Sequence, residues 1–156
     1  MLIEQTFVIN APAQQVWDFL FDIPRMSACM PGVESVTAVD DKTYEGRLKV
    51  KVGPISAQFG GKVTLVEVEA PHRLVAKAEG SDARTASLVS ATFGSTLKPL
   101  SEDTTEIAYQ IDVAVRGLLG RYGQGVMREV AKNMTARFAR CVDEALKDTA
   151  KDTANV

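Results

Sequence analysis

The segment GLLGRYGQGVMREVAKNMTARFARCVDEALK, from Gly117 to Lys147, decides the fold. Its apolar residues recur every three or four positions from Leu119 onward and form one seam: Met127, Val130, Met134, Phe138, Cys141 and Ala145, widened by Val126, Val142 and Leu146. This spacing predicts an amphipathic helix with a broad apolar face. No other segment predicts a helix of similar length, so the long helix must pack against a sheet.

The region from Val33 to Gly117 predicts that sheet, because apolar and polar residues alternate along it. We expect about six strands there, and the clearest ones are Thr43–Val52, Ile55–Glu69, Leu74–Gly80, Ala86–Leu97 and Thr105–Val115. Near Val66 the alternation slips by one residue, which predicts a β-bulge that bends the sheet. Short turns between half-polar strands predict an antiparallel meander with one covered face.

Three short elements precede this region. Leu2–Ile9 alternates as a strand, Asn10-Ala11-Pro12 begins a helix that ends near Phe21, and Arg25 to Met30 forms a further one or two turns. In the first helix we expect four buried residues: Ala13, Val16, Trp17 and Leu20. The predicted class is α+β, a curved antiparallel sheet of about seven strands wrapped around the long C-terminal helix. We expect one domain over residues 1–148 and a polar, frayed tail over 149–156.

Composition excludes several classes of protein. Lys and Arg number 18 against 20 Asp and Glu, a net charge of -2, which does not predict a nucleic-acid surface. No apolar run approaches the ~18 residues that span a bilayer, and the N-terminus does not resemble a secretion signal. Cys29 and Cys141 are few and far apart, so we expect reduced thiols in a cytoplasmic protein.

The inner face of the predicted sheet carries many small residues: Gly46, Ala57, Gly61, Ala76, Ala78, Ser87 and Ala91. Protein interiors are close-packed, so small residues here leave two interpretations. Either the helix lies very close to the sheet, or a cavity remains between them. The bulge and the methionines favour the cavity, since methionine suits an irregular apolar filling.

No reaction centre is visible in the sequence. The only histidine, His72, follows Pro71 in a predicted turn, and one histidine with two distant cysteines makes no metal set. Carboxylates fall on outward strand positions, in turns or on the polar side of the helix, so no inward pair offers acid–base chemistry. Serines 87, 90 and 95 have no visible base, and Cys29 is best interpreted as a buried structural thiol.

Four glycines, at positions 117, 120, 123 and 125, precede the helix. Their spacing matches neither the dinucleotide-binding fingerprint nor the phosphate-binding loop of nucleotidases. They either let the strand turn sharply into the helix or make a loose helix start that moves to admit a ligand. Arg116, Arg121 and Arg128 surround this start and could meet anionic lipid or a partner, with a solvated rim as the ordinary alternative.

Several segments, taken in order, resemble the CoxG family of carbon monoxide dehydrogenase proteins within the START-like (SRPBCC, helix-grip) superfamily. They are Phe7-Val8-Ile9-Asn10-Ala11-Pro12 with Val16-Trp17 and Asp22, Cys29-Met30-Pro31-Gly32, Lys51-Val52-Gly53-Pro54-Ile55 with Phe59-Gly60-Gly61, and Asp112-Val113 through Gly117-Leu118-Leu119-Gly120. The resemblance runs from about Leu2 to Leu146. It implies a helix-grip fold and a non-catalytic accessory protein of molybdenum hydroxylases, one that binds an apolar ligand such as a quinone.

The resemblance also implies a link between the enzyme and the membrane. Some relatives carry an extended C-terminal segment for attachment, whereas this chain ends in a polar tail, so we expect only transient contact through the helix start. We expect a cytoplasmic protein that can lie at the inner face of the cytoplasmic membrane, with molybdenum hydroxylase subunits as partners. No intrinsic cofactor is expected, only a bound quinone or lipid.

We expect the ligand to lie between the sheet and the long helix. The residues expected to line it are Leu20, Met30, Leu48, Val50, Phe59, Phe93, Tyr109, Leu119, Tyr122, Val126, Met127, Val130 and Met134. Two alternatives stay open. START-like relatives include polyketide cyclases and aromatases, which would make the protein an enzyme acting on an aromatic or apolar substrate. A closed interior would instead indicate a purely structural assembly factor.

Overall fold

A computed structural model describes the backbone of residues 1–154 and the side chains of residues 1–147. The chain begins with β1 (Leu2–Ile9), α1 (Ala13–Phe21) and α2 (Ile23–Cys29). Six further strands follow: β2 (Val33–Ala38), β3 (Thr43–Val52), β4 (Ile55–Glu69), β5 (Arg73–Asp82), β6 (Ser87–Ser101) and β7 (Thr104–Arg116). A 3-10 turn, η1 (Leu119–Arg121), leads into the long helix α3 (Gln124–Ala154).

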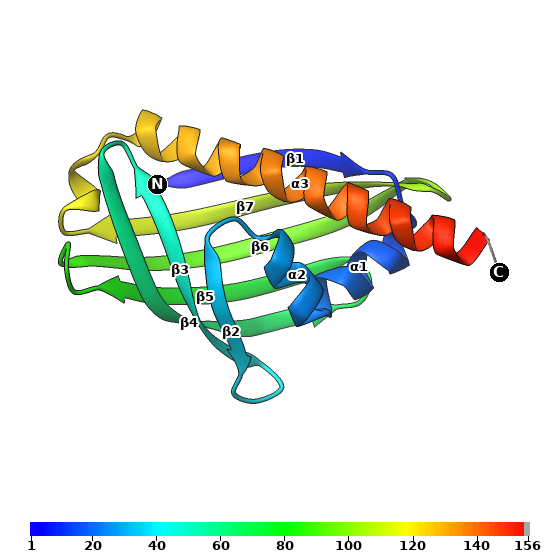
Figure 1. The fold of residues 1–156 in the computed structure, drawn as a ribbon, viewed down its shortest axis with the longest axis horizontal. Coiled ribbons are helices and arrows are strands. Elements are labelled where there is room, and N and C mark those ends of the chain that lie inside the picture. Colours follow the sequence, from blue (N-terminus) through cyan, green and yellow to red (C-terminus); the bar gives the residue numbers. More distant parts are fainter. Residues whose placement is uncertain (155–156) are drawn as a thin grey trace.

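All strands belong to one antiparallel sheet in the order β1-β7-β6-β5-β4-β3-β2. Figure 1 shows the sheet curling around α3, with β2 and β3 on one side of the helix and β1 on the other. Among the strands, α3 contacts mainly β1 and β3. The helices α1 and α2 cover the end of the sheet opposite the start of α3 (Figure 1). The predicted α+β fold is confirmed.

The predicted β-bulge is confirmed as well. The pairing of β4 with β5 shifts register between Leu65 and Glu67, at the position where the alternation of the sequence slips. Val66 and Val68 beyond the bulge are exposed. The bulge adds a residue to β4 only, and the strand bends strongly along its length (Figure 1).

The long helix differs from its prediction at both ends. It starts at Gln124 rather than near Leu119, because the chain first makes the 3-10 turn η1. Gly117 has φ +86°, in the left-handed region that favours glycine, and turns the chain out of β7. At the other end the helix continues to Ala154, through most of the segment expected as a frayed tail. Residues 155–156 of that tail lie outside the described residues.

The burial of α1 also departs in part from expectation. Val16 and Trp17 are buried as predicted, but Ala13 and Leu20 are only half-buried. Phe19 is buried instead. The helix therefore presents a face slightly rotated from the predicted one.

The expectation of two reduced, distant thiols is wrong. Cys29, the last residue of α2, and Cys141, on α3, form a disulfide although 112 positions separate them in the sequence. Spacing in the chain says little here, because the fold brings the end of α2 against α3. Cys29 is consequently no candidate nucleophile. The bond joins the two helical elements that cover the same end of the sheet.

Candidate functional site

The buried core is divided into two clusters that lie near opposite ends of α3. The first joins α1 and α2 to the later part of α3, and its members include Val16, Trp17, Phe19, Val142 and Leu146. The second joins the β3–β4 hairpin to η1 and the first turns of α3, and it is built on Val52, Ala57, Phe59 and Leu119.

Between the two clusters, apolar side chains on the inner side of the sheet and helix are only half-buried. They include Leu48, Phe93, Tyr109 and Met134. A core filled to the usual packing density would bury these side chains fully. The middle of the concave face is therefore the part of the interior with accessible apolar surface.

Most of the residues expected to line a ligand site lie along this interior. Several share the second cluster: Val50, Phe59, Leu119, Tyr122, Met127 and Val130. Leu20 packs against the first cluster instead. Met30, Leu48 and Met134 are half-buried, and Val126 is 39% exposed. Their contact with a ligand stays a prediction.

Phe93 and Tyr109 form an aromatic pair on neighbouring strands, with ring centroids 5.7 Å apart. The Tyr109 hydroxyl makes a short hydrogen bond with Thr135 of α3. Because the Thr135 hydroxyl donates to the Ala131 carbonyl at 2.8 Å, the shared proton belongs to Tyr109, which donates. Burial raises the pKa of Tyr109, and the bond with Thr135 opposes this only in part, so the phenol is neutral at pH 7. This bond ties the middle of α3 to β7.

An open groove of about 570 Å³ lies at the start of α3, beside the β3–β4 hairpin. It is lined by Lys51, Gly53, Gly125, Val126, Glu129, Val130 and Asn133. The groove is bounded by the same glycine-containing helix start that the sequence marks as soft. Val126 and Val130 are the predicted lining residues that border it.

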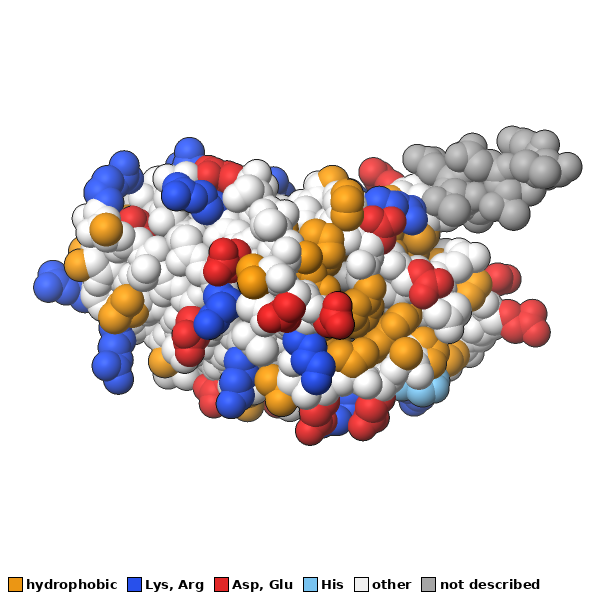
Figure 2. All heavy atoms as spheres, turned by 90° about the horizontal axis from the view of Figure 1, so that it is seen from below, with side chains coloured by type: hydrophobic (Ala, Val, Ile, Leu, Met, Phe, Trp, Pro, Cys, Tyr) orange, Lys and Arg blue, Asp and Glu red, His pale blue; other side chains and the backbone are white. Residues whose placement is uncertain are grey.

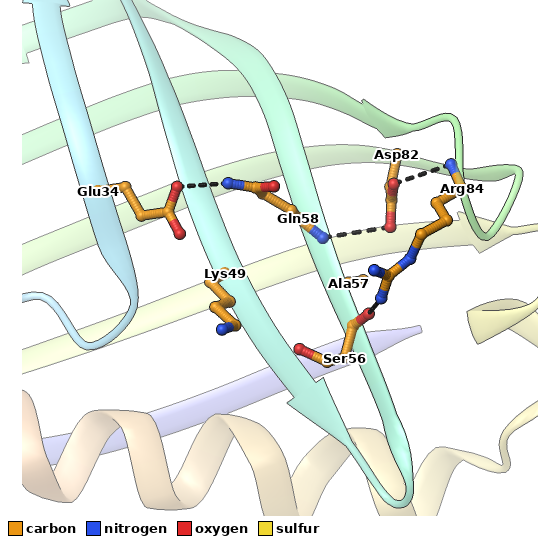
Figure 3. A pocket seen from close by; sticks show the side chains of 7 residues that line it. All are labelled: Glu34, Lys49, Ser56, Ala57, Gln58, Asp82 and Arg84. Carbon is orange, nitrogen blue, oxygen red and sulfur yellow. Dashed lines mark hydrogen bonds between the residues drawn. The ribbon is translucent and has the colours of Figure 1, made fainter.

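A second, smaller hollow of about 210 Å³ is polar (Figure 3). Its lining residues are Glu34, Lys49, Ser56, Ala57, Gln58, Asp82 and Arg84. The Gln58 amide donates to Glu34 at 2.5 Å, and the Arg84 guanidinium donates to the Ser56 carbonyl at 3.0 Å. Within the described residues, no buried polar side-chain atom of this hollow lacks a partner. Its polar groups thus satisfy one another, and nothing in it points to a ligand.

The prediction that carboxylates lie outward, in turns or on the polar side of the helix is wrong for Asp82, which is only 7% exposed. Strand β5 runs two residues beyond the predicted end at Gly80, and Asp82 then accepts hydrogen bonds from Gln58 N–H, Arg84 N–H and the Thr85 hydroxyl at 3.1–3.2 Å. Burial raises the pKa of this carboxyl, but these three donors outweigh it and the net pKa is lowered. The only signal in the sequence is an aspartate with a threonine three residues later, a common turn pattern.

The other candidate groups for chemistry have structural surroundings. The Ser87 oxygen accepts the Leu119 N–H at 3.2 Å and lies 2.9 Å from the Thr85 hydroxyl, so it connects the β5–β6 turn to η1. His72 is exposed in the β4–β5 turn, as predicted. Residues 1–147 contain no group of His, Cys, Asp and Glu side chains that could hold a metal ion. Across the described part of the chain, no helix has the length and hydropathy to cross a bilayer.

Similarity to solved structures supports the fold. The conserved protein from Geobacillus kaustophilus matches with a TM-score of 0.88 at 17% identity, over 96% of this chain and 97% of that one. A START superfamily protein from Mycobacterium smegmatis has a TM-score of 0.72 at 13% identity, over 95% and 98% of the two chains. The Zhui aromatase/cyclase from Streptomyces sp. R1128 has a TM-score of 0.69 at 15% identity, over 94% and 93%. At such identities these structures establish the START-like helix-grip fold alone.

Sequence comparison is narrower. No curated protein matches the chain at a significant level. The family model of the carbon monoxide dehydrogenase protein CoxG, however, matches residues 6–147, nearly the whole of the described chain. The segments that carry the resemblance in the sequence lie within this range or at its edge, from Phe7 to Gly120. The chain therefore belongs to the carbon monoxide dehydrogenase CoxG family and has a START-like fold.

Proposed function

We propose that the protein binds a hydrophobic small molecule, quinone-like or lipid-like, between the sheet and α3. It would serve a molybdenum hydroxylase of the carbon monoxide dehydrogenase type as a non-catalytic accessory protein. The observation that carries this proposal is the divided core. Two buried clusters are separated by half-buried apolar side chains on the concave face, and the groove at the start of α3 gives a route toward them. Ligand sites in proteins are mostly concave and apolar with few polar groups.

The proposed route of entry passes the helix start. Val126 is exposed beside the groove, and Tyr122, Met127 and Val130 lie deeper, in the second cluster. The Tyr109 hydroxyl is the polar group that could orient a ligand carbonyl, since it faces α3 across the interior. A quinone offers such carbonyl acceptors on an apolar ring.

The end of the molecule with this groove is also the proposed membrane-facing end. Exposed basic residues occur on its loops and helix start: Lys51, Arg84, Arg116, Arg121 and Arg128. Figure 2 shows Lys and Arg side chains gathered at this end, together with apolar ones. Positive charge beside a groove favours transient contact with an anionic bilayer, from which an apolar ligand could enter.

Ligand uptake tests the proposal directly. Protein purified without detergent is extracted with organic solvent for mass spectrometry, and the ligand-free protein is titrated with ubiquinone-1 by quenching of its aromatic fluorescence. We expect a co-purified apolar molecule or saturable, one-to-one uptake of the added quinone. An empty protein that takes up no quinone would show that the proposal is wrong.

A variant of α3 separates a hollow interior from a filled one. Ala131 is half-buried one turn before Thr135, so its side chain lies on the face of α3 that meets β7. If the interior is hollow, Ala131→Trp fills it and abolishes uptake with little change in stability. If the interior is filled, the added ring overpacks it and lowers stability by about 1–3 kcal/mol. Ala136→Trp, at an exposed position on the same helix, is the matched control.

The alternative function is an enzyme of the polyketide cyclase or aromatase type. One observation favours it: the neutral Tyr109 phenol points across the interior, where it could donate a proton to a substrate carbonyl. Tyr109→Phe and Tyr122→Phe would then abolish turnover of an aromatic substrate while quinone uptake persists. A carrier would show no turnover before or after these substitutions.

A further inference from the structure

The later part of α3 is held far more firmly than its start. Val142 and Leu146 are buried in the first core cluster, and Phe138 meets Phe7 of β1 edge-on at 6.4 Å. The Asn10 N–H donates to the Asp143 carboxylate at 2.8 Å. The start of the helix, in contrast, borders an open groove and has an exposed Val126. A rigid helix held at one end can move only by turning about that end.

The disulfide lies at the firmly held end and is the one covalent link between α3 and the rest of the fold besides the chain itself. Cys29 closes α2, and Cys141 stands next to the buried Val142. The two are the only cysteines of the chain, so the bond has no competing internal thiol. From Cys141 to Gln124 the helix is about 25 Å long, so a turn of about 10° would displace its start by about 4 Å.

We propose that the Cys29–Cys141 bond is a redox-cleavable pivot for α3. While it is intact, the start of the helix can swing open beside the groove and the later part stays attached to α2. When it is reduced, the later part keeps only its noncovalent contacts and the whole helix becomes mobile against the sheet. The bond is thus a modification site that controls how far α3 can open.

The reaction is an exchange with a dithiol reductant. A reductant thiolate attacks the sulfur of Cys141, which belongs to the half-buried partner, and the thiolate of buried Cys29 leaves. The second reductant thiol resolves the mixed disulfide. Two electrons pass from the reductant, the products are two protein thiols and one oxidised dithiol, and each departing thiolate takes up a proton. Because Cys29 leaves into an apolar surrounding, exchange with a monothiol should be slower than with a dithiol.

Hydrogen exchange of the purified full chain tests the pivot without any ligand. The oxidised protein, the protein reduced by dithiothreitol, and the Cys29→Ser/Cys141→Ser variant are compared. We expect amides of α2 and of residues 136–146 to exchange at least tenfold faster after reduction and in the variant, while the sheet stays protected. The midpoint of thermal unfolding should fall by about 10–20 °C, since the bond closes a loop of more than a hundred residues. Adding dithiothreitol to the variant should change nothing.

Three results would overturn the proposal. Two free thiols in protein that has never been reduced would mean that the bond does not form. Unchanged exchange in residues 136–146 after reduction would mean that the bond holds nothing in place. If the variant does not fold, the native protein is reduced below its melting temperature and its thiols are alkylated, and labelling that proceeds only at the rate of global unfolding would identify an ordinary structural bond. Since none of these readouts uses a quinone, the pivot and the proposed ligand can fail separately.

Discussion

Asp82 is a buried carboxylate whose charge is used to hold backbone together. Its three donors come from β4 and from the β5–β6 turn, so the side chain joins the end of one hairpin to the neighbouring strand. An ionised oxygen that accepts several N–H and O–H groups is stabilised in that form, which accounts for the lowered pKa. The polar hollow in Figure 3 is therefore a structural feature built around a carboxylate.

A pH-dependent loss of stability follows for this residue. The folded pKa of Asp82 lies below the unfolded value of about 3.9, so its stabilising effect is complete above that value and is lost as the pH falls through the folded pKa. Asp82→Asn keeps one acceptor oxygen but turns an N–H₂ group toward other donors. We expect its urea midpoint to lie below that of the wild type at pH 7, with the gap closing as the pH drops below 4.

The control for this prediction is Asp41→Asn, in the exposed β2–β3 turn. It should leave the midpoint close to that of the wild type at pH 7. A gap between wild type and Asp82→Asn that stays constant from pH 7 to pH 3 would show that the carboxylate charge does not contribute.

The connection between β7 and α3 contains glycines with two different roles. At Gly117, a Cβ would lie 1.9 Å from the carbonyl oxygen of Ala86, and φ is +86°. At Gly125, in the first turn of α3, a Cβ would have no neighbour within 4 Å. The two interpretations of the glycine run therefore apply to different positions: the first glycine is required by the turn, and the last one only softens the helix start.

Alanine substitutions at these two positions should act in opposite directions. Gly117→Ala should lower the free energy of unfolding by more than about 2 kcal/mol, because it combines left-handed strain with a backbone clash. Gly125→Ala should raise it by up to about 1 kcal/mol, since alanine favours the helix. Urea unfolding measures both. Equal effects of the two substitutions would contradict this division of roles.

Gly125→Ala also tests whether a soft helix start matters for exchange. The first two turns of α3 should exchange amide hydrogens more slowly in this variant than in the wild type, while residues 136–146 remain unchanged. Such a result would place the mobility of α3 at its start, as the half-buried side chains there indicate.

At the scale of the whole molecule, periodicity predicts the fold well and tertiary proximity poorly. The seam of α3, the alternation in β3 to β7 and the slip near Val66 are local patterns, and each appears in the structure at its expected place. The pairing of Cys29 with Cys141 and the burial of Asp82 depend on segments that meet only after folding. Apolar spacing does not predict the start of α3 at Gln124, because the spacing continues through the glycines although the backbone does not stay helical there.

The same limit applies to the candidate site. Small residues on the sheet predict room beside the helix, and the half-buried Leu48, Phe93 and Tyr109 agree with that expectation. The hydrogen bond between Tyr109 and Thr135, however, depends on how α3 is rotated about its axis, which a broad apolar seam does not determine. The sequence thus predicts which residues line the interior better than it predicts which of them touch.

The distribution of charge over the molecule leads to a test of the proposed membrane contact. The net charge is only -2, so attraction to an anionic bilayer must come from the basic end and not from the protein as a whole. Arg121 and Arg128 are exposed at the start of α3, and Arg137 and Arg140 are exposed farther along the same helix. A basic side chain near an anionic surface contributes about 1 kcal/mol, so Arg121→Gln/Arg128→Gln should weaken binding to phosphatidylglycerol-containing vesicles by about 30-fold. Arg137→Gln/Arg140→Gln, which removes the same charge, should weaken it far less. Flotation of vesicles at low and high salt measures both, and equal losses in the two variants would show that net charge, not the groove end, directs the protein to the bilayer.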